Sequence, residues 1–180
     1  MWIDEAGQPI RPYPVALDAE RHLFEECLIC QPACFFRADA YSAAGGIDPS
    51  YSSAFDYEFW IRLSRLGPIV GVPGCWALSR MHATNKSLGQ RQVMFAESIS
   101  VLSRYYGYVP FKWIYCRRAY LIDGSDQFFT PLTPSLLAFL ISLPEGIMKN
   151  RRHWPRYLRE WTAQVSWPGF LRMVGLKKDS

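Results

Sequence analysis

The chain lacks any long apolar run and has few charged residues. The most apolar stretch, residues 136–144, falls short of the roughly 18 residues that a membrane-spanning helix needs. The N-terminus has neither the basic region nor the apolar region of a signal peptide. Five cysteines is an odd number, so a complete disulfide framework is not expected. These absences favour reduced thiols and a cytoplasmic protein.

Several chemical motifs are also missing. There is no P-loop, no G-x-G-x-x-G fingerprint and no serine nucleophile elbow. No Asp-x-Asp pair occurs anywhere in the chain. The net charge of +4 is too small to indicate nucleic acid as a partner.

The 180 residues are 49% hydrophobic and 16% aromatic, which is enough for one packed domain with an appendage. Apolar periodicity, prolines and glycines predict a mixed α/β chain. The expected elements are a strand, turn and return in 1–14, helices in 18–29, 37–46, 53–67, 87–107 and 110–122, a buried strand in 33–36, and two strands in 68–82.

Two carboxylates, Asp56 and Glu58, begin the aromatic helix expected at 53–67. Acids in a first turn complement the helix dipole, and Ser53 three residues before Asp56 is typical of a capping box. The alternative is that Asp56 is a general base held against an apolar wall. Glu58, two positions later, points to a different face, so the two acids need not share a role.

The cysteines and His82 leave further alternatives open. Cys27, Cys30 and Cys34 have part of the spacing of a zinc site, but the second half of such a site is missing. Their apolar neighbours favour buried thiols. His82 lies where a strand runs into a polar loop, a common place for functional residues.

Four motifs follow one another along the chain: Gln31-Pro32 with Phe36-Arg37, Gly-Gly-Ile-Asp at 45–48, Asp-Tyr-Glu-Phe-Trp-Ile-Arg-Leu at 56–63, and Arg80-x-His82. In this order they resemble the C-terminal, acceptor-side half of family 2 glycosyltransferases with the GT-A fold. The resemblance covers roughly residues 1–90. It implies a partial GT-A domain, Rossmann-like with short strands and packed helices, over residues 1–125.

The resemblance also implies roles for single residues. Asp56 matches the general base of inverting enzymes, which takes the proton of the acceptor hydroxyl as it attacks the anomeric carbon. Phe55 stands where many relatives have a second acid. His82, with Arg80 beside it, matches a position that binds the metal or the donor diphosphate. The implied acceptor-site residues are Glu58, Tyr57, Trp60, Gln31 and Arg37.

The implied partners are a nucleotide-sugar donor, a glycan or lipid-linked acceptor, and Mg or Mn. The donor-binding half with its Asp-x-Asp motif is not in the sequence. We therefore expect no transfer by the chain without a donor half, which a separate polypeptide could supply. The alternative is a non-catalytic remnant or a membrane-associated binding module.

Residues 126–180 read as a helical, basic, Trp-rich appendage that begins after a turn-rich stretch near 125–133. Between Lys149 and Lys178 only Glu160 opposes the basic side chains. A basic amphipathic helix with tryptophans is typical of an in-plane membrane anchor. The other interpretation is a helix packed on the domain with its charge solvated. The first predicts a peripheral protein on the inner face of the cell membrane.

Overall fold

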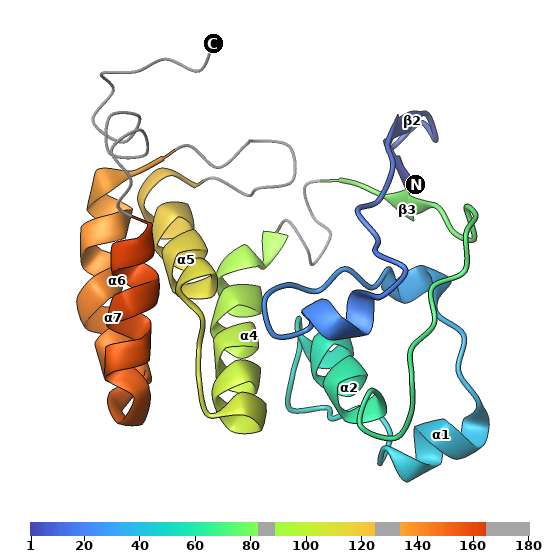
Figure 1. Cartoon of the computed structure of the whole chain (residues 1–180). Coiled ribbons are helices and arrows are strands. Elements are labelled where there is room, and N and C mark those ends of the chain that lie inside the picture. Colours follow the sequence, from blue (N-terminus) through green and yellow to red (C-terminus); the bar gives the residue numbers. More distant parts are fainter. Residues whose placement is uncertain (83–88, 125–133, 165–180) are drawn as a thin grey trace. The chain divides into compact units, whose positions relative to one another are not determined.

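The computed structural model describes residues 1–82, 89–124 and 134–164 (Figure 1). The chain divides into two compact units, Met1–Ser98 and Ile99–Ser180. It is a mixed α/β chain, mostly helical, with one small sheet in its described part. The first two residues of the helix predicted at 87–107, the turn-rich stretch predicted near 125–133 and the last part of the predicted appendage, after residue 164, lie outside the described residues.

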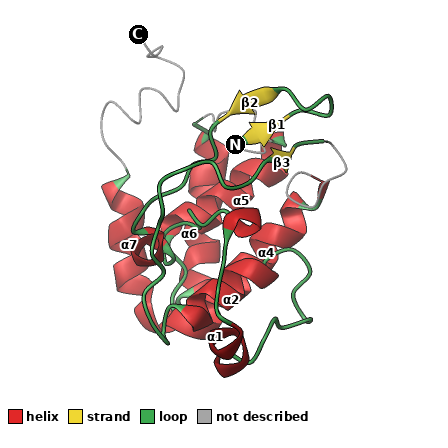
Figure 2. Cartoon of the chain, turned by 90° about the vertical axis from the view of Figure 1, so that its right-hand side faces the viewer, coloured by secondary structure: helices red, strands yellow, loops and turns green. Residues whose placement is uncertain are grey.

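The first unit contains a three-stranded sheet (Figure 2). Its strands are β1 (Trp2–Ile3), β2 (Pro9–Arg11) and β3 (Ser79–Arg80), in the order β2-β1-β3. Strand β1 pairs antiparallel with β2 and parallel with β3. The hairpin predicted for the first 14 residues is therefore confirmed, and β3 joins it from far along the chain.

The hairpin turn is built on the two residues that predicted it. The Asp4 carboxylate accepts a hydrogen bond from the Gln8 N–H at 2.7 Å, and Gly7 has a φ of 86°. Glycine takes this left-handed conformation without steric cost. The Arg80 guanidinium donates to the carbonyls of Asp4 and Glu5. Strand β3 thus holds the turn as well as the edge of β1.

Helix α1 (Ala38–Ala43) lies within the range predicted from its alanines. Gly45 and Gly46 follow it with φ values of 81° and 70°. Two left-handed residues in succession end the helix, as the glycine pair predicts.

Helix α2 (Phe55–Leu63) supplies the core of the first unit. It ends at Leu63, four residues before the predicted stop at Gly67, and Leu66 is exposed. Its buried residues form a continuous run rather than a stripe, which shows that the core encloses this helix on several sides. They are Tyr57, Glu58, Phe59, Trp60 and Ile61.

The capping box predicted at Ser53 is wrong. The N-cap residue is Ala54, which has no side chain able to cap, and the Ser53 hydroxyl donates to Gln90 at 3.1 Å. The Glu97 carboxylate, from helix α4 (Arg91–Tyr106), takes the capping role. It accepts from the backbone N–H groups of Ser52, Ser53 and Ala54 at 2.9, 2.7 and 2.8 Å.

The helix predicted for 18–29 is also wrong beyond its first turn. Only the 3₁₀ helix η1 (Ala19–His22) forms. Two glutamates, Glu25 and Glu26, would lie near the negative end of a longer helix, where acids are unfavourable. The Leu23 carbonyl instead accepts a hydrogen bond from the Tyr57 hydroxyl.

The buried strand predicted at 33–36 does not form. The 3₁₀ helix η2 (Gln31–Ala33) occupies its start, with Pro32 in its first turn. Phe35 is 87% exposed and Phe36 is 45% exposed. A buried strand needs paired neighbours, and no described strand lies beside these residues.

Of the two strands predicted in 68–82, only β3 forms. Pro68, Pro73 and the intervening Gly71 interrupt a ladder, because proline has no N–H and glycine favours bends. This segment pairs with other partners: the Gly71 N–H donates to the Leu17 carbonyl at 3.0 Å, and the Ile69 N–H donates to the Glu20 carboxylate.

The second unit is helical in its described part. After the end of α4 come α5 (Phe111–Asp123), α6 (Leu136–Lys149), the 3₁₀ helix η3 (Arg151–His153) and α7 (Trp154–Ala163). Helix α6 packs against both α5 and α7. The helices predicted in 87–107 and 110–122 are confirmed. Among residues 1–82, 89–124 and 134–164, no helix has both the length and the apolar character needed to cross a membrane.

Buried polar groups fix the helices of this unit. The Asn150 side chain accepts from the Val109 N–H at 2.8 Å and donates to the carbonyls of Val109 and Gly146, each at 3.0 Å. The Tyr157 ring lies so close to Gly146 that a Cβ there would meet it at 1.8 Å. Any side chain at position 146 would therefore push α7 away from α6.

Candidate functional site

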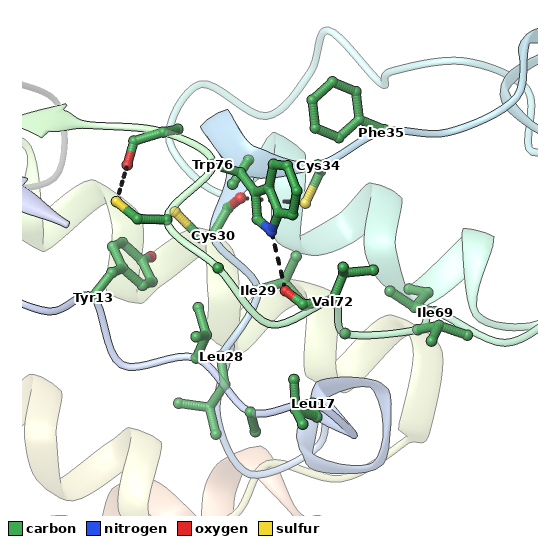
Figure 3. Close-up of a pocket in the computed structure, with 18 of the residues that line it drawn as sticks. Tyr13, Leu17, Leu28, Ile29, Cys30, Cys34, Phe35, Ile69, Val72 and Trp76 are labelled. Atoms are coloured by element: carbon green, nitrogen blue, oxygen red, sulfur yellow. Dashed lines mark hydrogen bonds between the residues drawn. The ribbon is translucent and has the colours of Figure 1, made fainter.

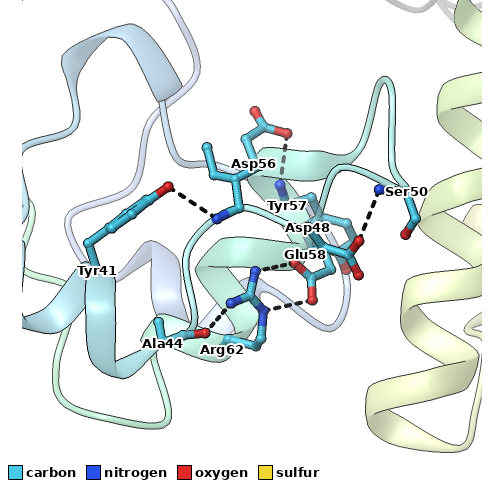
Figure 4. A network of polar contacts seen from close by, with 9 residues as sticks. Tyr41, Ala44, Asp48, Ser50, Asp56, Tyr57, Glu58 and Arg62 are labelled. Atoms are coloured by element: carbon cyan, nitrogen blue, oxygen red, sulfur yellow. Dashed lines mark hydrogen bonds and ion pairs between the residues drawn. The ribbon is translucent and has the colours of Figure 1, made fainter.

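Asp56 lies in the first turn of α2, where its carboxylate accepts a hydrogen bond from the Tyr57 N–H at 2.7 Å (Figure 4). The side chain is half-buried, and no basic group of the described residues pairs with it. Burial raises the pKa of Asp56, and hydrogen bonds from its own and the Tyr57 backbone N–H groups oppose this rise. The result is a carboxylate of increased basicity at a helix N-terminus.

The negative charge of Asp56 acts on three groups from earlier in the chain. Burial raises the pKa values of Tyr13, Cys27 and Cys34, and the Asp56 charge raises each of them further. For Cys34 the pKa reaches about 11, with the neighbouring Cys30 as a second cause. Asp56 therefore faces a segment of neutral phenol and thiol groups rather than a cationic site.

Glu58 has a structural role. Its carboxylate is 1% exposed and forms a two-pronged ion pair with Arg62, whose Nε and Nη2 lie 2.7 and 2.6 Å from its oxygens. The third arm of Arg62 donates to the Ala44 carbonyl at the end of α1 (Figure 4). The pair thus joins α1 to α2. As predicted, Glu58 and Asp56 lie on different faces.

Tyr57 and Trp60 are both buried, so neither presents an open surface to an acceptor. The Tyr57 hydroxyl donates to the Leu23 carbonyl. Trp60 differs because its indole N–H has no hydrogen-bond partner among the described residues. Buried donors are nearly always satisfied, so this one stands out.

Gln31 and Arg37, two of the implied acceptor-site residues, lie exposed on the surface. Gln31 begins η2 and is exposed. The side chain of Arg37 is 85% exposed and pairs with Asp39 at 3.0 Å. Their motif in the sequence therefore corresponds to an open segment, followed by the N-terminus of α1.

Arg80 and His82 lie at the end of β3, with His82 half-buried just before the undescribed residues 83–88. The Arg80 guanidinium donates hydrogen bonds to the hairpin carbonyls of Asp4 and Glu5. In the described part of the chain, no three His, Cys, Asp or Glu side chains come together as metal ligands. Among these described residues, His82 is therefore not part of a group of three such ligands.

A cavity of about 570 Å³ opens beside α2 in the first unit (Figure 3). Its walls come from Met1 and from four segments, near residues 12–17, 28–36, 60–63 and 69–77. They include no charged side chain, but the Met1 ammonium group, which donates to the Ala77 carbonyl, is charged. Trp60 and Ile29 are buried in these walls, whereas Phe35, Val72 and Trp76 are exposed. The space is an apolar hollow with an open rim.

The cavity and the Glu97 cap are the features that sequence reasoning missed. The lining residues are scattered apolar side chains with no motif, so no local signal marks them as one site. Glu97 lies more than 40 residues from the helix that it caps. The exposure of Phe35 and Trp76 could not be predicted either, because the sequence predicted strands at 33–36 and in 68–82 that do not form around them.

Comparisons with protein-family models, with curated proteins and with solved structures give no match for this chain.

Proposed function

We propose that the chain is the acceptor-side part of an inverting family 2 glycosyltransferase with the GT-A fold, and that Asp56 is its general base. The ordered motifs between Gln31 and His82 support the family. The observation that carries the proposal is the state of Asp56: half-buried, at a helix N-terminus, with a raised pKa and no cation beside it among the described residues.

In the proposed reaction, the Asp56 carboxylate accepts the proton of an acceptor hydroxyl. The acceptor oxygen forms a bond to the anomeric carbon of the sugar, and the bond from that carbon to the diphosphate breaks. Burial makes the carboxylate a stronger base, while the helix N-terminus helps to keep it ionised. Because the base must be ionised, the rate should rise with pH through the pKa of Asp56 and then level off.

In this proposal, the nucleotide-sugar donor and its metal are bound by a separate donor-binding half. The described residues offer no group of metal ligands, so no step is assigned to a metal here. A donor-binding half would bring the nucleotide-sugar and the Mg or Mn that family members use. The acceptor is a glycan or a lipid-linked sugar.

The test is a transfer assay on the whole chain joined to the donor-binding half of a family 2 enzyme of known donor. Labelled sugar should reach an acceptor in a lipid or glycan extract. Asp56→Asn should lower kcat by about 10²- to 10⁴-fold, as expected for loss of a general base. Asp39→Asn is the matched control, because Asp39 is an exposed acid on α1 paired with Arg37.

Two results would reject the proposal. One is a chimera that folds and binds its nucleotide-sugar yet transfers nothing. The other is an Asp56→Asn chimera that transfers as fast as the parent. Either result would favour the alternative of a non-catalytic binding module.

We also propose that the second unit associates with an anionic membrane surface. Helix α6 exposes Leu137, Leu140 and Met148 along one face, and Trp154 is 47% exposed at the start of α7. Exposed basic residues lie at the same end of α6 as Met148 and Trp154: Lys149, Arg151 and Arg152. Apolar and basic groups together are typical of peripheral membrane binding.

Co-sedimentation with vesicles rich in phosphatidylserine tests this association. Binding should be strong at low salt and weak at high salt. Replacing Arg151 and Arg152 by Gln should weaken it about tenfold or more, because each basic side chain near an anionic surface contributes about 1 kcal/mol. Arg21→Gln, an exposed change in the first unit, is the control. No binding to anionic vesicles at low salt would reject the association.

A further inference from the structure

The segment between α2 and β3 is extended without belonging to the sheet. Residues 68–73 contain no helix, turn or bend, and the chain runs there as a long trace from α2 towards β3 (Figure 1). Val72 precedes a proline, which favours extended backbone. Exposure alternates along the segment: Ile69 and Gly71 are half-buried. Val70 and Val72 are exposed, so the segment has the alternation of a strand.

One side of this segment is already paired. The Gly71 N–H donates to the Leu17 carbonyl at 3.0 Å, and the Ile69 N–H donates to the Glu20 carboxylate. In an extended chain, every second residue directs its N–H and C=O groups to the same side. The backbone groups of the residues before, between and after these two therefore point to the opposite side.

That opposite side is an open edge, formed by Pro68, Val70 and Val72. In the described part of the chain, the Val70 N–H and C=O groups make no hydrogen bond. The Val72 N–H makes none there either, whereas the Val72 carbonyl accepts from the Trp76 indole at 3.2 Å (Figure 3). Pro68 has a carbonyl but no N–H. Backbone groups left unpaired along an edge are a template for a further strand.

The open edge is complementary to itself. In an antiparallel pair centred on Val70, the Val70 residues of two copies exchange both of their N–H···O bonds. Val72 then lies opposite the second copy's Pro68, and its N–H donates to that carbonyl. The Val72 carbonyl needs no donor from the second copy, because Trp76 already supplies one, and Pro68 has no N–H to offer. Each backbone group of the edge therefore finds a partner.

The side chains around the open edge also suit a second copy. Val70 is 74% exposed, Val72 is 62% exposed, and Phe35 at the cavity rim is 87% exposed. Exposed apolar patches of this kind mark interaction sites. No residue that lines the cavity has a charged side chain, and the Met1 ammonium group donates to the Ala77 carbonyl. Two copies can therefore meet here without repulsion between like-charged side chains.

A free peptide would lose chain entropy on pairing with this edge, whereas a second copy brings an edge that is already ordered. We propose that two copies of the chain associate through their open edges, in an antiparallel pair with two-fold symmetry and with the two Val70 residues opposite each other. The hydrogen bonds of the pair join Val70 to Val70 and each Val72 to the other copy's Pro68. This inference does not rest on sugar transfer.

Sedimentation velocity of the whole chain, without nucleotide-sugar or lipid, tests the association. The chain should pass from monomer to dimer as its concentration rises from about 1 to about 100 µM, at the weak end of the affinities of stable interfaces. Val70→Pro removes the central N–H of each copy and should weaken dimerisation about tenfold or more. It removes no hydrogen bond within the described part of the chain. Val70→Ile keeps the N–H and a branched apolar side chain, so this matched control should dimerise as the parent does.

Hydrogen exchange on the unmodified chain locates the interface and covers the case in which Val70→Pro does not fold. The Val70 and Val72 amides should exchange more slowly as the concentration rises, because pairing protects them. The Gly71 amide, bonded to the Leu17 carbonyl in both states, should not change. A chain that stays monomeric at about 100 µM would overturn the proposal. A dimer that Val70→Pro leaves intact, or in which the Val70 amide exchanges at the same rate at every concentration, would also overturn it.

Discussion

Replacing Glu97 by Gln should weaken the start of α2 more than any other single change at its N-terminus. One Glu97 oxygen accepts from the N–H and hydroxyl of Ser52, and the other accepts from the N–H groups of Ser53 and Ala54. A glutamine keeps one acceptor oxygen and puts an NH₂ group where the second oxygen was. Two backbone donors would then face another donor.

The expected cost follows from these contacts. A hydrogen bond to a charged group contributes about 1.5–3 kcal/mol to stability. Two are lost, but the Glu97 side chain is partly exposed, so water replaces part of each. We expect the free energy of unfolding of the first unit to fall by about 2 kcal/mol at pH 7.

The effect should depend on pH with a defined sign. Although partial burial raises the pKa of Glu97, the N–H groups of Ser52, Ser53 and Ala54 hold it below its ordinary value. Its contribution is therefore complete above the unfolded pKa of about 4.3 and is lost as pH falls through the folded pKa. Gln does not titrate, so the difference between the two proteins should shrink in acid.

Hydrogen exchange at the Ser53 and Ala54 amides is the most direct assay, since it reports on this helix end alone. Urea unfolding at pH 7 and at pH 3 gives the free-energy difference at each pH. Glu25→Gln, at an exposed glutamate, controls for the loss of one negative charge. Unchanged amide protection in Glu97→Gln, or a difference that grows in acid, would refute the reasoning.

Three further predictions concern buried groups. Glu58→Gln should destabilise the first unit by about 3 kcal/mol in urea unfolding, because it leaves the Arg62 charge without its partner; a cost below 1 kcal/mol would contradict the buried ion pair. Asn150→Ala should cost the second unit about 2–4 kcal/mol in thermal unfolding by losing three buried hydrogen bonds, and an unchanged Tm would count against this. Iodoacetamide at pH 7.5 should modify exposed Cys75 well before Cys34, whose pKa is about 11; equal rates by mass spectrometry would show that Cys34 is not shielded.

The elements that could be predicted from the sequence are those whose stabilising residues are near neighbours. The hairpin is fixed by Asp4 and Gly7 within one turn, and α1 is ended by Gly45 and Gly46 directly after it. Long helices such as α5 carry an apolar period over several turns. In each case the deciding interactions span fewer than about ten residues.

The failures involve contacts between distant segments. The 18–29 segment leaves the helical path where the Leu23 carbonyl meets Tyr57, and the cap of α2 comes from Glu97 rather than Ser53. For the candidate site, Asp56 could be found because a motif surrounds it. The cavity could not, since four separate segments contribute its walls.

The distant contacts of α2 bear on how the chain folds during synthesis. This helix has nine residues, too few to be stable alone in water. Its cap, Glu97, is 43 residues beyond Ala54, and the Leu23 carbonyl is 34 residues before Tyr57. We therefore expect α2 to stay unstructured on the ribosome until Glu97 has emerged, and its aromatic residues to be exposed to chaperones and proteases throughout that interval.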